Sequence, residues 1–281
     1  MPPIRPVPRR VRAASAPVPR PFRAVFCVLF CVVLRRARHF DGRHRDRRRA
    51  CAPVQPQERP VTTIGDIVLV AGGFVDGSGW RAVHDELTRD GLRVHIVQLP
   101  TRSLRDDVAV TRRALDGLDG PAVLIGHSYG GVVITEAGTH PNVASLAYVA
   151  AFAPDRGESA RTLITPPAPP VRPPVEGFLF LDRDRFATSY AADLPDRMAA
   201  FMADSQVPFG VAALGGRVTE PAWRHRPSWY LVATEDRMIP TPAQHLMAER
   251  AGATTVEVIG SHAVHISQPA AVADLIRQAA E

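Results

Sequence analysis

The chain has 281 residues, of which 46% are hydrophobic, enough for one large domain or for a domain with a tail. Its formal net charge of +6 is unevenly distributed: residues 1–60 carry 15 arginines against three acidic residues, whereas residues 61–281 carry 19 arginines against 25 acidic residues. The longer part is therefore mildly acidic and has no basic stripe, which argues against a nucleic-acid-binding protein.

Residues 1–60 contain ten prolines, all three cysteines and one apolar run at residues 24–34. Eleven residues are too few to cross a bilayer as a helix, although that length suits the apolar region of a signal peptide. Arginines follow the run at once, without a small-residue cleavage motif. We expect residues 1–60 to be a disordered extension, such as a start codon assigned too far upstream would add. One alternative is a secretion signal or membrane-surface anchor, and another is a specific binding arm.

From residue 61 onward, short apolar runs alternate with helix-like stretches. Helices are predicted at residues 82–89, 104–118, 132–137 and 270–280, and strands at residues 67–70, 94–99, 122–125, 145–151, 229–233 and 255–259. Strands that are apolar on both faces and alternate with helices indicate a parallel sheet covered on both sides. We therefore predict one α/β domain over residues 61–281, with a mostly parallel, doubly wound sheet.

Residues 155–222 interrupt this alternation. They contain a proline-rich run at residues 165–174 and short helical pieces around residues 184–204. An insertion between two core strands at this point would lie over the C-terminal ends of the strands. We expect it to form a helical lid.

A serine lies in a glycine-rich turn between a predicted strand and a predicted helix. Residues 126–130 read GHSYG, the pattern G-x-S-x-G. A serine in such a turn has strained backbone geometry, and small residues two positions before and after it avoid clashes. Its hydroxyl then projects at the sheet edge, beside a helix N-terminus. Ser128 is therefore predicted to be a nucleophile, whereas the neighbouring His127 is expected to pack.

A serine hydroxyl becomes a good nucleophile when a base takes its proton, and the base needs an orienting carboxylate. Asp236 and His262 each follow a predicted strand, in the chain order Ser, acid, His that this turn favours. Both are expected at the same sheet edge as Ser128. We predict His262 to be the general base and Asp236 to be its orienting acid.

Each helper residue has rivals. His265 lies one helical turn after His262, where we expect it to pack or to contact solvent. Glu235 adjoins Asp236, but its side chain should point elsewhere. Asp155 follows the strand predicted at residues 145–151 and is the alternative acid.

The loop after the first predicted strand reads AGGFVDGSGW over residues 71–80. An oxyanion hole needs a second backbone N–H beside that of Tyr129, and glycines allow the backbone to approach a substrate closely. Gly73 is predicted to supply this donor, with Phe74 as the second choice. Trp80 is expected to pack.

At these residues the chain resembles the α/β-hydrolase superfamily over roughly residues 65–280. The segments AGGFVDGSGW, GHSYGG and ATEDRMIP, followed by GSHAVHISQP, carry the resemblance. The branch is similar to the small-lid esterases, which include plant methylesterases, hydroxynitrile lyases and many bacterial hydrolases. Ala71 stands where the family usually has histidine, and the chain has no lysine, which argues against the lyase chemistry. Ser128 argues against the dehalogenases and epoxide hydrolases, whose nucleophile is aspartate.

The resemblance implies a serine hydrolase that cleaves a small or medium, largely apolar carboxylic ester or thioester through an acyl-serine intermediate. A cofactor-free perhydrolase or acyltransferase on the same triad, and a hydrolase-like binding protein with little turnover, are the alternatives. We expect the substrate to contact Phe74 and aromatic side chains of the lid, although ordinary packing would explain those of the lid equally well. The lid residues are Phe178, Phe180, Phe186, Tyr190 and Phe201.

We expect no metal, no organic cofactor and no nucleic-acid partner, and a small-molecule ester as substrate. Membrane contact is expected only through residues 1–60. The expected location is cytoplasmic, unless those residues act as a signal or an anchor.

Overall fold

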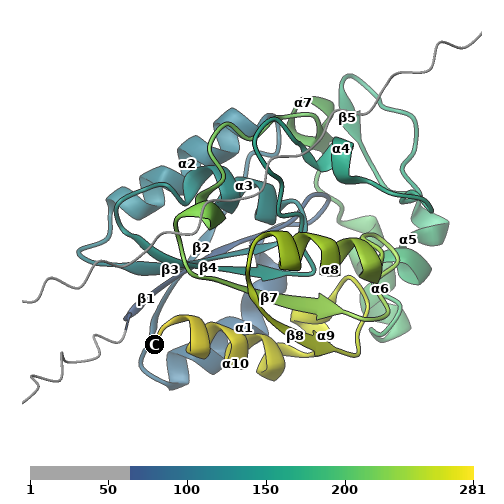
Figure 1. The fold of residues 1–281 in the computed structure, drawn as a ribbon. Coiled ribbons are helices and arrows are strands. Elements are labelled where there is room, and N and C mark those ends of the chain that lie inside the picture. The colour runs from purple at the N-terminus through teal and green to yellow at the C-terminus, as the bar shows by residue number, and fades with distance from the viewer. Residues whose placement is uncertain (1–63) are drawn as a thin grey trace, which may run out of the picture. The chain divides into compact units, whose positions relative to one another are not determined.

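Six parallel strands form the centre of the computed structural model, which describes residues 64–281. The order across the sheet is β2-β1-β3-β4-β7-β8, and the prediction of a parallel sheet is confirmed (Figure 1). The expectations for residues 1–60 lie outside the described residues. The strands are β1 (Asp66–Val70), β2 (Arg93–Val97), β3 (Ala122–His127), β4 (Val143–Val149), β7 (Ser228–Ala233) and β8 (Thr254–Val258).

Central and edge strands differ in burial. Every residue of β1 and β3 is buried, and successive residues face opposite sides of the sheet: Val68 and Val70 join one apolar core, Ile67 and Leu69 the other. β8 has three exposed residues and two half-buried ones because it lies at the edge. The expectation that every strand is apolar on both faces is therefore wrong for β8.

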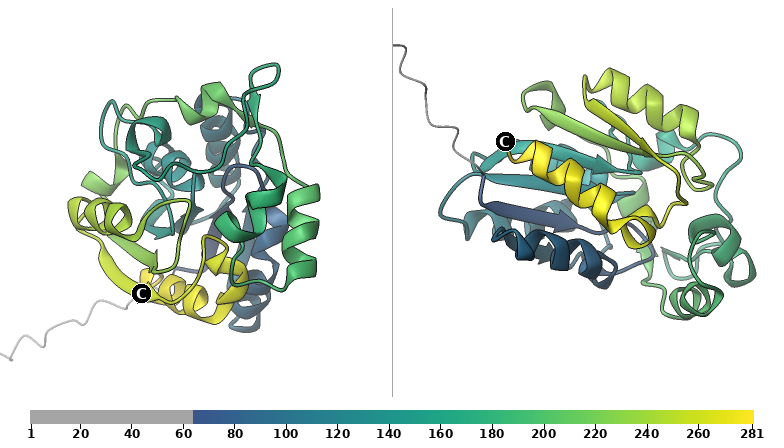
Figure 2. Two further views of the ribbon diagram at one scale, coloured as in Figure 1. Left: turned by 90° about the vertical axis from the view of Figure 1, so that its right-hand side faces the viewer. Right: turned by 90° about the horizontal axis from the view of Figure 1, so that it is seen from below.

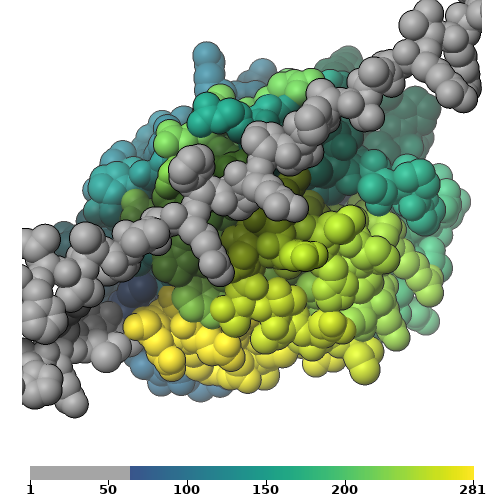
Figure 3. All heavy atoms as spheres, in the orientation of Figure 1, coloured from purple at the N-terminus to yellow at the C-terminus, as the bar shows by residue number. Residues whose placement is uncertain are grey.

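Helices cover both faces of the sheet (Figures 1 and 2). Buried residues of α1 (Arg81–Arg89) and α10 (Pro269–Ala279) belong to one core, and those of α2 (Leu104–Asp116), α3 (Gly130–Ala137) and α8 (Thr241–Arg250) to the other. The face that carries α8 is visible in the space-filling view (Figure 3). Our prediction did not include α8, whose apolar residues are not gathered into one stripe.

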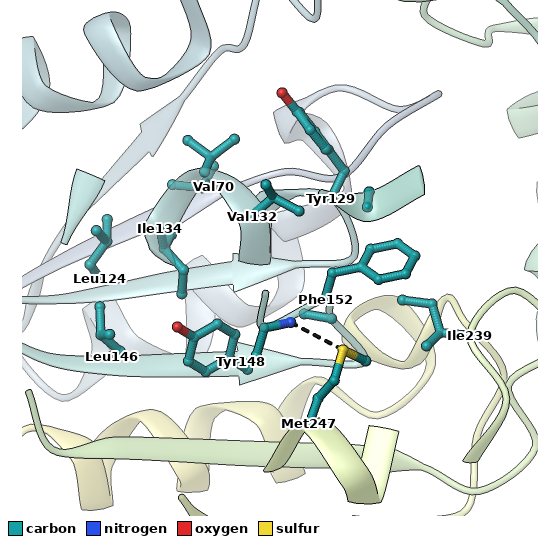
Figure 4. Close-up of a cluster of buried hydrophobic side chains, with 14 of the residues drawn as sticks. Val70, Leu124, Tyr129, Val132, Ile134, Leu146, Tyr148, Phe152, Ile239 and Met247 are labelled. Carbon is teal, nitrogen blue, oxygen red and sulfur yellow. Dashed lines mark hydrogen bonds between the residues drawn. The ribbon is translucent and has the colours of Figure 1, made fainter. Parts of the chain in front are cut away.

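The core beneath α3 and α8 is tightly packed (Figure 4). Strand residues Leu124 and Leu146 face α3, and Met247 reaches in from α8. The Met247 sulfur accepts a hydrogen bond from the Ala153 N–H at 3.3 Å. The backbone just after β4 is therefore anchored to α8.

Most of the segment between β4 and β7, called the insertion below, lies beyond the C-terminal ends of the strands, and its last part returns along α3 (Gly130–Ala137) to the start of β7 (Figure 1). Its position over that edge supports the proposal that it is a lid. It contains α4 (Ala160–Leu163), β5 (Phe178–Leu179), α5 (Arg183–Tyr190), α6 (Asp196–Asp204), β6 (Phe209–Gly210), α7 (Val211–Leu214) and the 3₁₀ turn η2 (Ala222–Arg224), with β5 and β6 paired antiparallel.

The strand order reverses between β1 and β3. The chain passes from β1 to β2 on one side, then crosses to β3 on the other. Val70 at the end of β1 pairs with Gly126 near the end of β3, so the loops that follow these strands lie side by side. Such a reversal is where open α/β sheets bind ligands.

Candidate active site

Ser128 occupies the turn between β3 and α3. Its φ of +53° lies in the left-handed region, which is strained for a residue with a side chain. The turn is so tight that a Cβ on Gly126 would lie 2.5 Å from the Gly130 carbonyl oxygen, and one on Gly130 would lie 2.6 Å from the Val70 carbonyl oxygen. Both glycines are therefore required for this backbone path.

The loop after β1 passes directly against the serine. A Cβ on Gly72 would lie 2.8 Å from the Cβ of Ser128, which explains why glycine stands there. The backbone N–H groups of Gly73 and Tyr129 have no hydrogen-bond partner among residues 64–281. Both residues line the same cavity as Ser128. These two N–H groups are our candidates for holding an oxyanion.

Ser128, His262 and Asp236 form a hydrogen-bonded chain. His262 Nδ1 lies 2.8 Å from Asp236 Oδ2, and His262 Nε2 lies 2.8 Å from the Ser128 hydroxyl oxygen. Because a carboxylate only accepts, Nδ1 carries the proton and Nε2 is free to accept from the serine. All three side chains are largely shielded from solvent, with exposed fractions of 8% for Ser128, 6% for Asp236 and 1% for His262.

The Asp236 carboxylate is fixed by several donors besides His262. Its Oδ1 accepts hydrogen bonds from the Met238 and Ile239 N–H groups at 2.7 and 3.0 Å. Its Oδ2 accepts one from the Gln244 side-chain amide at 3.0 Å. A buried carboxylate with this many donors is held in one orientation toward the imidazole.

The rival residues lie elsewhere. Glu235 is exposed, and Asp155 pairs with Arg224, which keeps the pKa of Asp155 below its usual value. His265 is buried against Trp80 and His127, with ring centroids 4.9 and 4.1 Å away. Burial and the nearby His262 lower the pKa of His265 to about 3. None of the three hydrogen-bonds to Ser128 within the described part of the chain.

His127 does more than pack. Its Nε2 donates a hydrogen bond to the backbone carbonyl oxygen of His262 at 2.8 Å. Burial, followed by the neighbouring His265 and His262, holds the pKa of His127 well below its usual value. A neutral His127 therefore supports the turn that carries His262.

The cavity beside Ser128 is small and apolar, with a volume of about 50 Å³. Phe74 lines it, but Phe178, Phe186, Tyr190 and Phe201 do not. Phe186 and Tyr190 are fully buried and stack on each other, while Phe201 is 69% exposed. The cavity is lined by Gly73, Phe74, Ser128, Tyr129, Phe152, Ala160, Ile164, Pro169, Val171, Leu179, Phe209, Leu214, Met238 and Ile239.

Asp107 is a buried acid near the site that the sequence pattern did not reveal. It accepts hydrogen bonds from the Tyr129 hydroxyl and from the Thr101 N–H, both at 2.8 Å. Burial raises the pKa of Asp107 despite these donors. Asp107 contacts the site through Tyr129, and Gln244 contacts it through Asp236. No local sequence pattern indicates either contact.

Two further observations concern the described residues only. Within residues 64–281, no three His, Cys, Asp or Glu side chains gather where they could hold a metal ion. No helix of that range has the length and hydropathy needed to cross a membrane.

The sequence matches the profile of the alpha/beta hydrolase family over residues 67–275. A pyrethroid hydrolase of Sphingobium wenxiniae is 30% identical over 253 residues, which cover 78% of this chain and 89% of that protein. A crystal structure of a pyrethroid hydrolase superposes with a TM-score of 0.67 at 25% identity, covering 78% of this chain and 98% of that one. Polyneuridine aldehyde esterase shares the fold, with a TM-score of 0.65 at 19% identity over 78% of this chain and 100% of that one.

The chain therefore belongs to the alpha/beta hydrolase family. Within that family it is a hydrolase of the esterase branch, as the resemblance of its motifs predicted.

Proposed function

We propose that the protein hydrolyses a small or medium, largely apolar carboxylic ester through an acyl-serine intermediate. The observation that carries this proposal is the hydrogen-bonded chain Ser128–His262–Asp236 at the wall of an apolar cavity. The similarity to a pyrethroid hydrolase supports an ester as the substrate.

In the first half-reaction, the Ser128 oxygen attacks the ester carbonyl while His262 Nε2 takes the hydroxyl proton. The Gly73 and Tyr129 N–H groups hold the oxyanion, and one such donor is typically worth about 3 kcal/mol of the barrier. Asp236 orients the imidazole and stabilises its cationic form. His262 then returns the proton to the leaving alcohol, which leaves the acyl group on Ser128.

In the second half-reaction, water attacks the acyl-serine. His262 takes a proton from the water and returns it to Ser128 as the carboxylic acid leaves. The apolar cavity has room for only a short group on one side of the ester. A bulkier group would have to lie outside it or displace the insertion.

The test uses p-nitrophenyl esters from acetyl to octanoyl with wild type, Ser128→Ala, His262→Ala and His265→Gln. We expect Ser128→Ala and His262→Ala to lose at least about 10³-fold in kcat, as is typical of triad residues. His265→Gln should retain most of the activity, because His265 does not contact Ser128. Full activity in Ser128→Ala would refute the mechanism.

Product analysis with added alcohol or peroxide tests the nature of the acceptor. Free carboxylic acid as the only product in every mixture supports hydrolysis. A new ester or a peracid as the main product would replace our proposal with acyl transfer or perhydrolysis on the same serine.

A further inference from the structure

The turn that carries His262 is bound to the insertion on both sides of that residue. Ala263 N–H donates a hydrogen bond to the Tyr190 carbonyl oxygen at 2.9 Å, and the Ser261 hydroxyl oxygen lies 3.1 Å from the same oxygen. The Tyr190 ring lies edge-on to the His262 imidazole, with centroids 4.8 Å apart and an angle of 84° between the planes. The end of α5 therefore packs directly on the catalytic histidine.

Three residues beyond α5, the Asp193 carboxylate completes this attachment. It accepts hydrogen bonds from the Ser261 N–H at 2.9 Å, from the Ser261 hydroxyl, and from the Ser267 hydroxyl at 2.6 Å. Partial burial alone would raise the pKa of Asp193. The hydrogen bonds from Ser261 and Ser267 lower that pKa by more than burial raises it, so the pKa lies below its usual value. Asp193 is therefore an ionised acceptor whose donors lie on both sides of His262.

The backbone beside His262 is also held by two hydrogen bonds outside the insertion: the Val264 N–H donates to the Ser261 carbonyl oxygen at 3.1 Å, and the Glu235 N–H donates to the Gly260 carbonyl oxygen at 3.0 Å. His262 lies in a turn between β8 and α9 (Val264–Ser267), outside any helix or strand. Its carbonyl oxygen accepts from His127, and the N–H groups of its two neighbours donate to the insertion. The sheet and these bonds place the turn near Ser128, and the insertion adds the contacts to the residues directly before and after His262.

We infer that Asp193 is a positioning residue for His262, and that the insertion is part of the catalytic machinery as well as a cover for the substrate. This inference rests on the proposed function. Asp193 fixes Ser261, the residue before His262, and thereby holds Nε2 at hydrogen-bond distance from the Ser128 hydroxyl. Displacing a reacting group by about 1 Å can lower a rate about 10²-fold.

Asp193→Ala should therefore lower kcat about 10- to 100-fold and leave KM within about threefold of wild type. Asp193→Asn should restore most of the rate. Its amide oxygen, in the place of Oδ2, can accept from both the Ser261 N–H and the Ser267 hydroxyl. Its amide nitrogen, in the place of Oδ1, can donate to the Ser261 hydroxyl, so the attachment survives without the charge.

The experiment measures kcat and KM on the best p-nitrophenyl ester for wild type, Asp193→Ala, Asp193→Asn and Asp196→Ala. Asp196 is the matched control, since it is, like Asp193, an exposed aspartate of the insertion, but none of its side-chain atoms hydrogen-bonds to the His262 turn. A second readout is the rate at which a fluorophosphonate labels Ser128, because this reaction needs an activated serine but no ester. Thermal unfolding shows whether each variant is folded at the assay temperature.

Slow labelling and low kcat in folded Asp193→Ala, with recovery in Asp193→Asn and no change in Asp196→Ala, would support the inference. Wild-type kcat and labelling in Asp193→Ala would overturn it, as would a raised KM with unchanged kcat. If Asp193→Ala does not fold, wild-type-like Asp193→Asn supports the hydrogen-bonding role and an equally slow Asp193→Asn overturns it. A wild type that hydrolyses no ester would instead contradict the proposed function.

Discussion

Ser128 combines a reactive position with a backbone conformation that is unfavourable for serine. Its φ of +53° is one that glycine adopts at little cost, whereas a residue with a Cβ loses about 1 kcal/mol there. The side chain is nevertheless needed, because it supplies the hydroxyl that His262 contacts. Stability and activity therefore favour different residues at this position.

We expect Ser128→Gly and Ser128→Ala to be equally inactive but to differ in stability. The free energy of unfolding should be about 1 kcal/mol larger for Ser128→Gly than for Ser128→Ala, because glycine relieves the backbone strain and makes the variant more stable. Urea denaturation of the two variants gives this difference directly. If Ser128→Ala is the more stable of the two, the turn does not strain residue 128.

The buried histidines behind His262 make stability depend on pH. The pKa of His265 is about 3 in the folded protein, against about 6.5 in an unfolded chain. Between these values the unfolded chain binds a proton that the folded chain does not. The stability linked to His265 is therefore fully present above pH 6.5 and is lost as the pH falls toward 3. His127, whose pKa is also lowered, acts in the same direction.

His265→Gln should reduce this dependence by one proton. Near pH 5, the slope of the unfolding free energy against pH should become shallower by about 1.4 kcal/mol per pH unit. Denaturant unfolding from pH 7 to pH 4.5 measures both slopes. Parallel curves for wild type and variant would mean that His265 binds its proton equally in the folded and unfolded states.

At the scale of elements, close contact between α3 and the ends of the strands defines the nucleophile turn. A Cβ on Gly131 would lie 2.2 Å from the Phe152 carbonyl oxygen and 2.8 Å from the Ala151 Cβ. Both of those residues follow β4, in a stretch of backbone that is anchored to α8 by the hydrogen bond from Ala153 to Met247. Neither side of this contact can move away without disturbing the core that Figure 4 shows.

Gly131→Ala should therefore destabilise the protein by about 3 kcal/mol, since it forces α3 away from the end of β4. Gly120→Ala is the control, because a Cβ at Gly120 meets nothing within 4 Å. Thermal unfolding should show a melting temperature about 6–12 °C lower for Gly131→Ala and little change for Gly120→Ala. A similar shift in both variants would argue against the close contact.

The core strands could be predicted because their signals are local. An apolar run that is buried on both faces, as in β1 and β3, is visible without knowledge of its partners. β8 shows the limit of that signal: its position at the edge of the sheet leaves it exposed, and the run itself does not reveal that position. The weakly patterned helix α8 was missed for a related reason, since its place is set by packing against the sheet.

Prediction of the site shows the same division. The motif around Ser128 and the strand-end positions of Asp236 and His262 follow from the sequence, and the structure brings the three side chains together. The contacts of Asp193 and Tyr190 could not be predicted from the sequence, because they join segments about 70 residues apart through an irregular insertion. Whether an aromatic residue of that insertion faces the cavity depends on how the insertion docks, which no local pattern encodes.

At the scale of the whole molecule, the sheet and the insertion contribute to the proposed site in different ways. The reversal between β1 and β3 brings the glycine loop beside Ser128, and β7 and β8 deliver Asp236 and His262 to the same edge. The insertion then packs on the His262 turn from outside the sheet. Residues far apart in the chain thus meet because parallel strands all end at one edge.

All of these parts come from residues 64–281, which leads to a prediction about the arginine-rich segment. The hydrogen bond from the Ile64 N–H to the Ala280 carbonyl oxygen, 3.0 Å long, ties the start of this range to its C-terminal helix. We expect a chain of residues 61–281 to hydrolyse the same p-nitrophenyl esters with kcat within about twofold of the full chain, and to unfold at a similar temperature, since no part of the proposed mechanism uses residues 1–60.

The same comparison separates catalysis from a role of residues 1–60 at membranes. The shorter chain has 19 arginines against 25 acidic residues, whereas residues 1–60 have 15 arginines against three. Binding to anionic liposomes should therefore be stronger for the full chain and should weaken as salt is added. Equal liposome binding by the two chains would contradict a membrane role for residues 1–60, and it would not affect the proposed catalytic mechanism. A shorter chain that is folded but inactive would mean that residues 1–60 contribute to the site itself.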